Sequence, residues 1–232
     1  MIDVTEALNF RSGQSQATLT EKEDSLQQLT NALLTGKSDE TKLRAYAAIK
    51  KGNNEREILD AVVEVVNIIS DLQEVNQFDQ PKIASLESAV NTCLQVLEEW
   101  LSKSEGRFGL MVTVGPVGLK TGLLSSLALS ASLRAIGFRS TNLGKTQTAL
   151  DLLRNSEELD ADLVIPILPA DGTEHLLAFA EAYERGGFKN KFEIISIAPG
   201  TPENLHSTLT IAQNAEEAIS KATQWAIKKS RG

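Results

Sequence analysis

The stretch from Phe108 to Leu123, FGLMVTVGPVGLKTGL, decides the fold of this chain. Its first part, Gly109–Val114, is an almost unbroken run of apolar or small residues, which is typical of a strand covered on both faces of a parallel sheet. Three glycines and a proline follow, so the backbone of the next loop can approach a bound group closely. In open α/β sheets, ligands bind at such a loop. The stretch therefore predicts a strand, a ligand-binding loop and a helix.

After this stretch the pattern alternates between helices and strands. Short connections between such units imply a parallel, doubly wound sheet, here of five strands. The predicted fold class of this part is α/β, with a flavodoxin-like, Rossmann-like topology. Helices are predicted over residues 123–136, 147–154, 173–185 and 215–228, and the later strands over residues 138–143, 162–168, 192–198 and 208–212.

Before the stretch, the pattern is helical. Thr20 and Glu23 have the spacing of a capping box, and the helix that they begin is expected to end at Gly36. A second helix is predicted from about Ser38 to Gly52. Its apolar side chains are expected to face inward, and they are Leu43, Tyr46, Ala47 and Ile49.

Two further helices complete a predicted four-helix bundle. Asn53 or Asn54 can cap the third helix, whose apolar residues cover more than one stripe, as expected for the central helix of a bundle. Pro81 suits the first turn of the fourth helix, which is expected to reach Trp100. Short loops between four such helices predict a bundle.

The chain is expected to divide into three parts. Residues 1–19 mix Asn, Ser, Gln and Gly with little periodicity, and they predict a flexible leader. Residues 20–103 form the helical-bundle cap, and residues 104–232 form the α/β domain. The polar segment Ser102–Arg107 is the predicted linker.

Composition and charge limit the classes of function that are expected for this chain. The chain has 23 Lys and Arg against 31 Asp and Glu, a formal charge of -8, so no general attraction to nucleic acid is expected. No signal-peptide pattern and no apolar run of membrane-spanning length occur, and a cytoplasmic protein that does not bind membranes is expected. The single cysteine, Cys93, is predicted to be a buried structural thiol.

This order of parts resembles the cobalamin (B12)-binding module of methyltransferase-associated corrinoid proteins and of B12-dependent sensors. The resemblance covers Leu26 to Lys228 and implies a helical cap, a flavodoxin-like domain and cobalamin as the cofactor. The segments that carry it are Ala32–Lys37, Ile49–Gly52, Glu57–Leu59, Gln80–Ala84, Arg134–Phe138, Asn142–Gly144, Asp160–Val164 and Ile197–Pro199.

The family's cobalt-binding loop is degenerate in this chain. That loop has the form Asp-x-His-x-x-Gly, in which the His is the lower axial ligand and the Asp is its hydrogen-bonded partner. In this sequence the three positions are Val117, Leu119 and Gly122. Valine and leucine cannot coordinate a metal or relay a proton. The usual His-on mode of cobalamin binding is therefore disfavoured.

Three other positions of the resemblance also differ. The family's Ser-x-Leu segment becomes Pro166–Leu168 and loses its hydroxyl group. Its paired glycines become Ser196 and Ile197, which adds bulk where the nucleotide tail of the cofactor would lie. The upper-face histidine of the sensor branch falls at Lys82.

The resemblance places a ligand pocket between the bundle and three loops of the α/β domain. No metal ligand is predicted in it, and the cofactor stays open as cobalamin bound base-on, another tetrapyrrole or none. The residues predicted to line the pocket are Gly115, Val117, Gly118, Leu119, Gly122, Pro166, Leu168, Asp171, Gly172, Ser196 and Ile197.

A few polar groups lie near this predicted site. Asp171–Glu174 is explained as a loop and helix cap, and it is a source of hydrogen bonds if a ligand binds. His175 is in the first turn of the next helix, where it is either a solvated or capping side chain or a contact to a metal or cofactor. Lys120 is the natural partner for an anion at the glycines. His206 has no clear partner in the sequence.

Other chemistry is poorly supported. Gly144–Thr146 imitates the end of a phosphate-binding loop, but Arg139 replaces the required earlier glycine. Gly115–Gly122 has the wrong spacing for a dinucleotide fingerprint. No paired carboxylates, nucleophile with base or metal-ligand cluster indicates an enzyme.

Three functions stay open. The first is a corrinoid-protein-like binding or regulatory protein, such as a sensor or accessory protein, that lacks the axial His. The second is a methyl-carrying corrinoid subunit of a cobalamin-dependent methyltransferase system. The third is a ligand-free scaffold. The expected partner is a methyltransferase, a regulator or a second copy of the chain.

Overall fold

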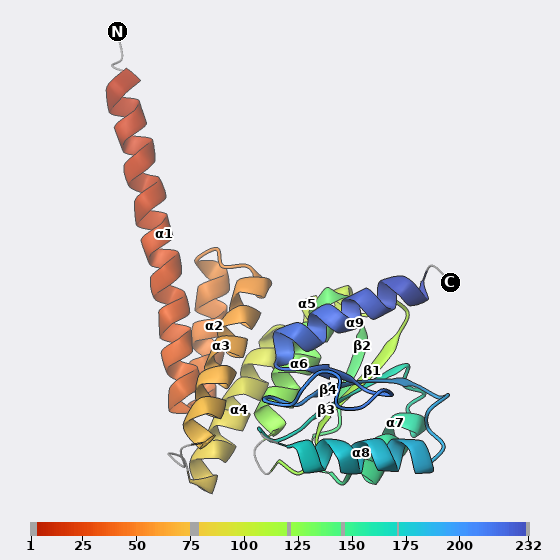
Figure 1. The fold of residues 1–232 in the computed structure, drawn as a ribbon. Helices are drawn as coiled ribbons and strands as arrows, with labels where there is room; N and C mark the ends of the chain where they lie inside the picture. Colours follow the sequence, from red (N-terminus) through yellow and green to blue (C-terminus); the bar gives the residue numbers. More distant parts are fainter. Residues whose placement is uncertain (1–3, 75–78, 120–121, 145–146, 171, 231–232) are drawn as a thin grey trace. The chain divides into compact units, whose positions relative to one another are not determined.

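The chain divides into two compact units, Met1–Glu98 and Glu99–Gly232 (Figure 1). The first is helical and the second is α/β, which is the order that the sequence predicts. The sequence analysis had set the change near residue 103. The computed structural model describes residues 4–74, 79–119, 122–144, 147–170 and 172–230.

The helical unit contains the four predicted helices, α1 to α4. The first helix begins much earlier than Thr20, at Val4, so the segment predicted as a leader is helical from there on. Gly13 is the single glycine before Gly36, and no proline precedes Pro81, so no residue in this segment forces a break in the helix. The bounds are α1 (Val4–Thr35), α2 (Ser38–Lys50), α3 (Glu55–Glu74) and α4 (Gln80–Val96).

Asn54, and not Asn53, caps α3. The Asn54 Oδ1 atom accepts a hydrogen bond of 2.9 Å from the Glu57 backbone N–H, and Glu57 Oε2 accepts one of 2.8 Å from the Asn54 N–H. This is a reciprocal capping box. Asn53 is buried, and its side chain donates to Ser25 Oγ and to the Ala48 carbonyl, so it joins α1 to the end of α2.

The predicted inward face of α2 is wrong. Leu43 and Tyr46 have exposed fractions of 71% and 48%. The buried face of α2 consists of Thr41, Ala45 and Ala48, which lie four and three residues apart on one side of the helix. These small side chains let α2 pack closely in the bundle, and this packing outweighs the burial of two larger side chains. In α3, by contrast, residues on more than one stripe are buried, as predicted.

Lys82, which the sequence resemblance assigns to the upper-face histidine of the sensors, joins α4 to the end of α1. Its Nζ donates to the Leu34 carbonyl at 3.1 Å and to the Thr35 carbonyl at 2.8 Å. The last carbonyls of a helix have no partner within the helix and carry partial negative charge, so an ammonium group stabilises them. Lys82 therefore has a structural role inside the helical unit.

Lys82→Met is expected to lower the free energy of unfolding by about 1 kcal/mol, because it removes two charge-assisted hydrogen bonds at a partly exposed position. Urea unfolding followed by circular dichroism measures the change. Lys42→Met, at an exposed position of α2, is the matched control and should change stability by less than half as much. Equal losses in the two variants would contradict a specific role for Lys82.

The fourth predicted helix ends early. Helix α4 stops at Val96, and a short helix, α5 (Glu98–Ser104), follows in the region predicted as its last turn and the linker. The Leu97 N–H donates to the Cys93 and Leu94 carbonyls, which closes the last turn of α4. Cys93 is fully buried, as predicted, and burial raises the pKa of its thiol to about 12, so the thiol stays protonated at neutral pH.

In the described part of the α/β unit, five parallel strands form one sheet in the order β2-β1-β3-β4-β5. This is the flavodoxin-like order that the sequence predicts. Strand β1 starts two residues later than expected because Gly109 has a positive φ of 66° and turns the chain. The strands are β1 (Met111–Pro116), β2 (Arg139–Asn142), β3 (Leu163–Ile167), β4 (Glu193–Ile197) and β5 (Thr210–Ala212).

Two helices cover each face of the sheet (Figure 1). Val112, Ile165 and Ile195 pack with α6 and α9, whereas Val164 and Ile194 pack with α7 and α8. Alternate residues of each strand thus enter two separate cores, as in a doubly wound fold. The four helices are α6 (Leu123–Ile136), α7 (Ala149–Glu158), α8 (Thr173–Arg185) and α9 (Ala215–Lys229). No helix in the described ranges is long and apolar enough to cross a membrane.

Candidate functional site at the carboxyl edge of the sheet

The loop after β1 starts as an extension of the sheet. The Val117 N–H donates to the Ile167 carbonyl at 2.9 Å, and the Gln147 N–H donates to the Pro116 carbonyl at 3.0 Å. The Val117 side chain is buried in the core between the sheet and the helices α7 and α8. Val117, which the sequence resemblance assigns to the family's aspartate, is therefore an apolar core residue in this chain.

Leu119 and Gly122 also serve packing. Leu119 is partly buried and packs against the core under α6 and α9. A Cβ atom at Gly122 would lie 2.4 Å from Cβ of Pro116, so only glycine fits at this start of α6. The glycine shared with the family motif is thus explained by the close approach of the loop to the strand end.

The described residues of this loop offer no metal donor. Val117, Gly118, Leu119 and Gly122 have no side-chain nitrogen or oxygen, and Lys120 lies outside the described residues. Among the described residues, no group of three or more His, Cys, Asp or Glu side chains could hold a metal ion. Cobalamin ligation by the loop in the family's manner does not fit these residues.

His175 lies against this loop. Gly118 has a positive φ of 73°, and a Cβ atom on it would stand 2.9 Å from Cε1 and 3.0 Å from Nδ1 of His175. The imidazole therefore packs against the Gly118 backbone. His175 is the third residue of α8 and is exposed. The sequence analysis placed both residues near the ligand edge but did not predict this contact, because it joins segments far apart in the chain.

The predicted lining residues of the three central strands lie mainly on one face. Gly115 pairs in register with Pro166, and the Leu168 N–H donates to the Ile197 carbonyl at 2.9 Å. Because side chains alternate along strands, Gly115, Pro166 and Ser196 all face α7 and α8. Ile197 instead packs into the opposite core.

Helix α7 packs closely on the sheet at Gly115. A similarly close contact occurs at Gly172, where α8 begins. The Leu152 side chain of α7 would stand 2.8 Å from a Cβ at Gly115. Gly172 caps α8, and a Cβ there would lie 2.6 Å from the Pro169 carbonyl oxygen. Asp171, also predicted to line the pocket, lies outside the described residues.

Two buried hydroxyl groups near the carboxyl end of β4 have unmet hydrogen bonds. Ser196 Oγ and Thr201 Oγ1 are buried and have no partner among the described residues. An unsatisfied buried hydroxyl costs about 1–3 kcal/mol. Thr41 Oγ1 and Asn53 Oδ1 in the helical unit are also buried without a partner among the described residues, so unmet hydrogen bonds are not confined to this edge.

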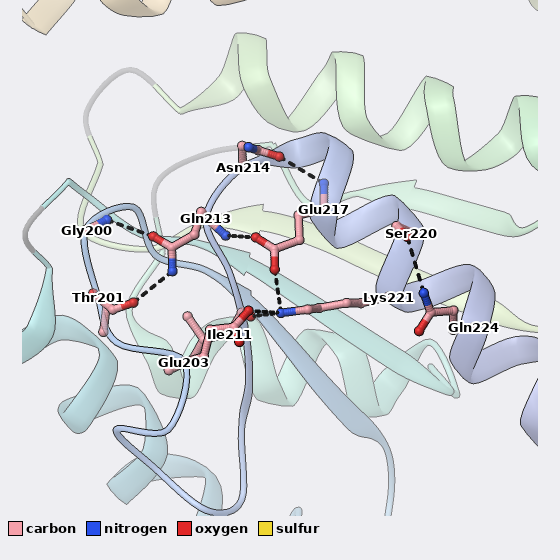
Figure 2. Close-up of polar contacts among 10 residues, drawn as sticks. All are labelled: Gly200, Thr201, Glu203, Ile211, Gln213, Asn214, Glu217, Ser220, Lys221 and Gln224. Atoms are coloured by element: carbon pink, nitrogen blue, oxygen red, sulfur yellow. Dashed lines mark hydrogen bonds and ion pairs between the residues drawn. The ribbon is translucent and has the colours of Figure 1, made fainter.

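The loop after β4 is held by side chains from the segment Gln213–Lys221 (Figure 2). Gln213 accepts from the Gly200 N–H at 3.0 Å and donates to the Thr201 carbonyl at 2.8 Å. Lys221 binds Glu203 at 2.7 Å and Glu217 at 2.6 Å. Sequence reasoning missed this network. Its one local signal was the spacing of Asn214 and Glu217, since the Glu217 N–H donates to Asn214 Oδ1 at the start of α9.

Glu217 makes the α/β unit sensitive to acid. The Gln213 backbone N–H, and then Lys221, lower the pKa of Glu217 from its ordinary 4.5 to about 2. A depressed carboxyl pKa stabilises the folded state above the unfolded-state pKa, and this contribution is lost as the pH falls from about 4.5 to about 2.

Glu217→Gln is therefore expected to lower the melting temperature at pH 7, and the difference from the parent chain should shrink steadily as the pH falls from 4.5 toward 2. Thermal melts at closely spaced pH values measure it. Glu216→Gln removes a charge from an exposed position in the same helical turn, outside the network, and is the control. A gap that stays constant across this range would contradict the role given to Glu217.

The second histidine has a local partner. His206 Nδ1 is hydrogen-bonded to Thr208 Oγ1 at 2.8 Å in the loop before β5. The sequence analysis found no partner for it. This bond engages one ring nitrogen of His206, whereas His175 makes no hydrogen bond or ion pair with the described residues.

Comparison with solved structures gives the fold a name. The monomethylamine corrinoid protein of Methanosarcina barkeri matches with a TM-score of 0.61 at 17% sequence identity, over 88% of this chain and 99% of that one. The chain has the fold of a corrinoid protein. This identifies the architecture that the sequence resemblance implied, and it leaves the activity open.

Two further structures match this corrinoid-protein fold less closely. The methanol:cobalamin methyltransferase complex of Methanosarcina barkeri has a TM-score of 0.45 at 14% identity, over 88% of this chain and 80% of that chain. A cobalamin-binding protein from Desulfitobacterium hafniense DCB-2 has a TM-score of 0.45 at 13% identity, over 86% and 98% of the two chains. No protein-family model and none of the curated proteins matches the sequence.

Proposed function

We propose that this chain is a corrinoid-protein-like binding or regulatory protein that takes a planar tetrapyrrole at the carboxyl edge of its sheet without a histidine from the loop after β1. The observation that carries the proposal is the combination of a corrinoid-protein fold with packed, apolar Val117 and Leu119 at the positions that the sequence resemblance assigns to the family's aspartate and histidine. Both side chains pack into cores, so the loop is built for packing and not for ligation.

Two unsatisfied hydroxyl groups are a second observation in favour of a ligand at this edge. Ser196 and Thr201 each bury an oxygen without a partner among the described residues, and such a group costs stability unless another molecule pairs with it. A ligand with polar groups on its periphery, as cobalamin and haem both have, would supply hydrogen bonds that the protein lacks.

Binding is tested directly with two pigments. The purified chain is mixed with hydroxocobalamin or with haem, passed through a gel-filtration column, and examined by absorption spectroscopy. The proposal expects one pigment to co-elute with the protein near one equivalent and to show a changed spectrum. Elution of both pigments as free compounds with unchanged spectra would remove the tetrapyrrole proposal and favour the scaffold.

The methyl-carrier role is the less favoured alternative. A methyl carrier needs a cobalt centre, and the described residues of the loop after β1 provide no side-chain ligand for one. Stoichiometric cobalt after reconstitution, together with methyl transfer to an added thiol, would favour the carrier over the sensor.

A sensor acts through a partner, and we infer a protein partner here, either a methyltransferase, a regulator or a second copy of the chain. Light scattering with and without bound pigment distinguishes the last of these, because a ligand-dependent change in mass in the isolated protein requires self-association.

A further inference from the structure

Helix α2 has an exposed stripe on the side opposite its buried face. Two apolar side chains form the middle of the stripe, and one charged side chain stands at each end. The stripe consists of Asp39, Leu43, Tyr46 and Lys50, all of them exposed. Leu43 and Tyr46 are the two most exposed large apolar side chains among the described residues. Within the described helical unit, no other element covers them.

The stripe has the spacing of a seam between two helices. Its members are four, three and four residues apart, which is the spacing of the a and d positions of a heptad. Side chains with this spacing stay on one side of a helix and pack against a similar row on a second helix. Helix α2 has 13 residues, so the seam is about 20 Å long.

The stripe is complementary to itself when two copies run antiparallel. Its centre is between Arg44 and Ala45, and its members are placed symmetrically about that point. A twofold axis through the centre puts Leu43 of each copy opposite Tyr46 of the other. The same axis puts Asp39 of each copy opposite Lys50 of the other, so that unlike charges meet at both ends.

Asp39 and Lys50 each lack a charged partner among the described residues. Their neighbours are engaged, because Glu40 binds Lys37 and Arg44, and Lys51 binds Glu21 at 2.6 Å. Each end of the seam therefore has an unpaired charge, and the two charges are of opposite sign. A second copy of the chain would supply the partner for both.

We propose that α2 is a self-association surface, through which two copies of the chain pair antiparallel about a twofold axis at the centre of the stripe. This accounts for a helix that buries small residues inside its own bundle and leaves Leu43 and Tyr46 outside, where the second copy buries them. The inference goes beyond the proposed function, since it involves the helical unit and no pigment. Because the seam is one short helix, the contact is small and the association depends on protein concentration.

Sedimentation of the full chain without pigment, over a wide range of protein concentration, tests the association. The parent chain is expected to show a reversible equilibrium between monomer and dimer. Leu43→Glu and Tyr46→Glu should each raise the dissociation constant by about tenfold or more, because each places a charge in the centre of the contact. Leu177→Glu, at an exposed position of α8, is the matched control and should leave the constant unchanged.

Charge reversal at the ends tests the antiparallel register. Asp39→Lys and Lys50→Asp should each weaken the dimer by about fivefold or more, because the attractive pair occurs twice in each dimer and becomes repulsive. The double variant should recover the parent affinity. Both substitutions oppose the dipole of α2, so an effect through helix stability alone would be greatest in the double variant.

Cysteine crosslinking gives an independent test of direction. Asp39→Cys and Lys50→Cys chains, mixed under mild oxidation, should form a disulfide between unlike chains. Each variant alone should form much less, because like positions are far apart in an antiparallel pair. The native Cys93 is buried and does not compete.

A chain that stays monomeric at every concentration overturns the proposal. So does a dimer that withstands Leu43→Glu and Tyr46→Glu, because its contact is then elsewhere. Crosslinks between like positions, or a double charge variant weaker than either single one, overturn the antiparallel register. Failure of the chain to retain a pigment bears on the proposed function alone, since none is present in these experiments.

Discussion

Leu119→His is expected to give the chain a protein nitrogen on the cobalt of cobinamide, a corrin without a nucleotide base. Leu119 is partly buried in the loop after β1, at the position that the resemblance assigns to the family's axial histidine. With Co(II) cobinamide, the parent chain should show no nitrogen splitting in its electron paramagnetic resonance spectrum, and the variant should show the splitting and retain the corrin about tenfold or more better.

The same variant shows whether the space for a pigment is present. A gain of nitrogen coordination means that the space is intact and that only the donor is missing from the loop. As a control, Leu123→His adds an imidazole in the first turn of α6 and should add no coordination. A Leu119→His variant that folds yet retains no more corrin than the parent chain would show that the loop after β1 does not border a ligand.

Phe179→Ala is expected to cost about 3–5 kcal/mol of unfolding free energy, which is the largest effect on stability that we predict. Phe179 is fully buried in α8, within the core formed with α7 and the sheet. Truncation removes most of an aromatic side chain and leaves a cavity in the layer that supports His175 and the start of α8. A loss of this size is a large part of the stability of an ordinary domain.

Urea unfolding of the full chain, followed by circular dichroism, measures this loss. Leu177→Ala is the matched control, because Leu177 is in the same helix with 44% of its surface exposed. It should change stability by less than about 1 kcal/mol. Similar losses in the two variants would mean that α8 is held in place by something other than the core around Phe179.

The sequence predicted the α/β unit more accurately than the helical unit. Helices α6 and α8 have the bounds predicted for them, Leu123–Ile136 and Thr173–Arg185, because glycines flank them and their apolar spacing is regular. The buried strands are short apolar runs that no helix pattern competes with. Helix α7 was misplaced by a few residues because its start is set by the Thr148 hydroxyl, which accepts from the Asp151 N–H.

Contacts between segments far apart in the chain could not be predicted from local sequence patterns. The buried face of α2 was mispredicted because Ala45 and Ala48 pack closer than Leu43 and Tyr46 could, a choice that depends on the neighbouring helices. The approach of His175 to Gly118 likewise depends on sheet order, which sets the loops after β1 and β3 side by side.

The candidate site was predicted in outline only. Its expected place at the carboxyl edge follows from the alternation of strands and helices, and the lack of a carboxylate and an imidazole at two positions of the loop follows from Val117 and Leu119. The opposite faces of Ser196 and Ile197 follow from the alternation of side chains along a strand. The structure adds the unsatisfied state of the Ser196 hydroxyl, which depends on its neighbours in space.

The loop after β4 is held by hydrogen bonds and ion pairs, whereas the start of α8, at the same edge of the sheet, is held less tightly. Gln213 and Lys221 tie residues 200–203 to the start of α9 through hydrogen bonds and ion pairs, so that side resists displacement. His175, near the start of α8, makes no hydrogen bond or ion pair with the described residues. The start of α8 is therefore expected to move more easily than the α9 side of this edge.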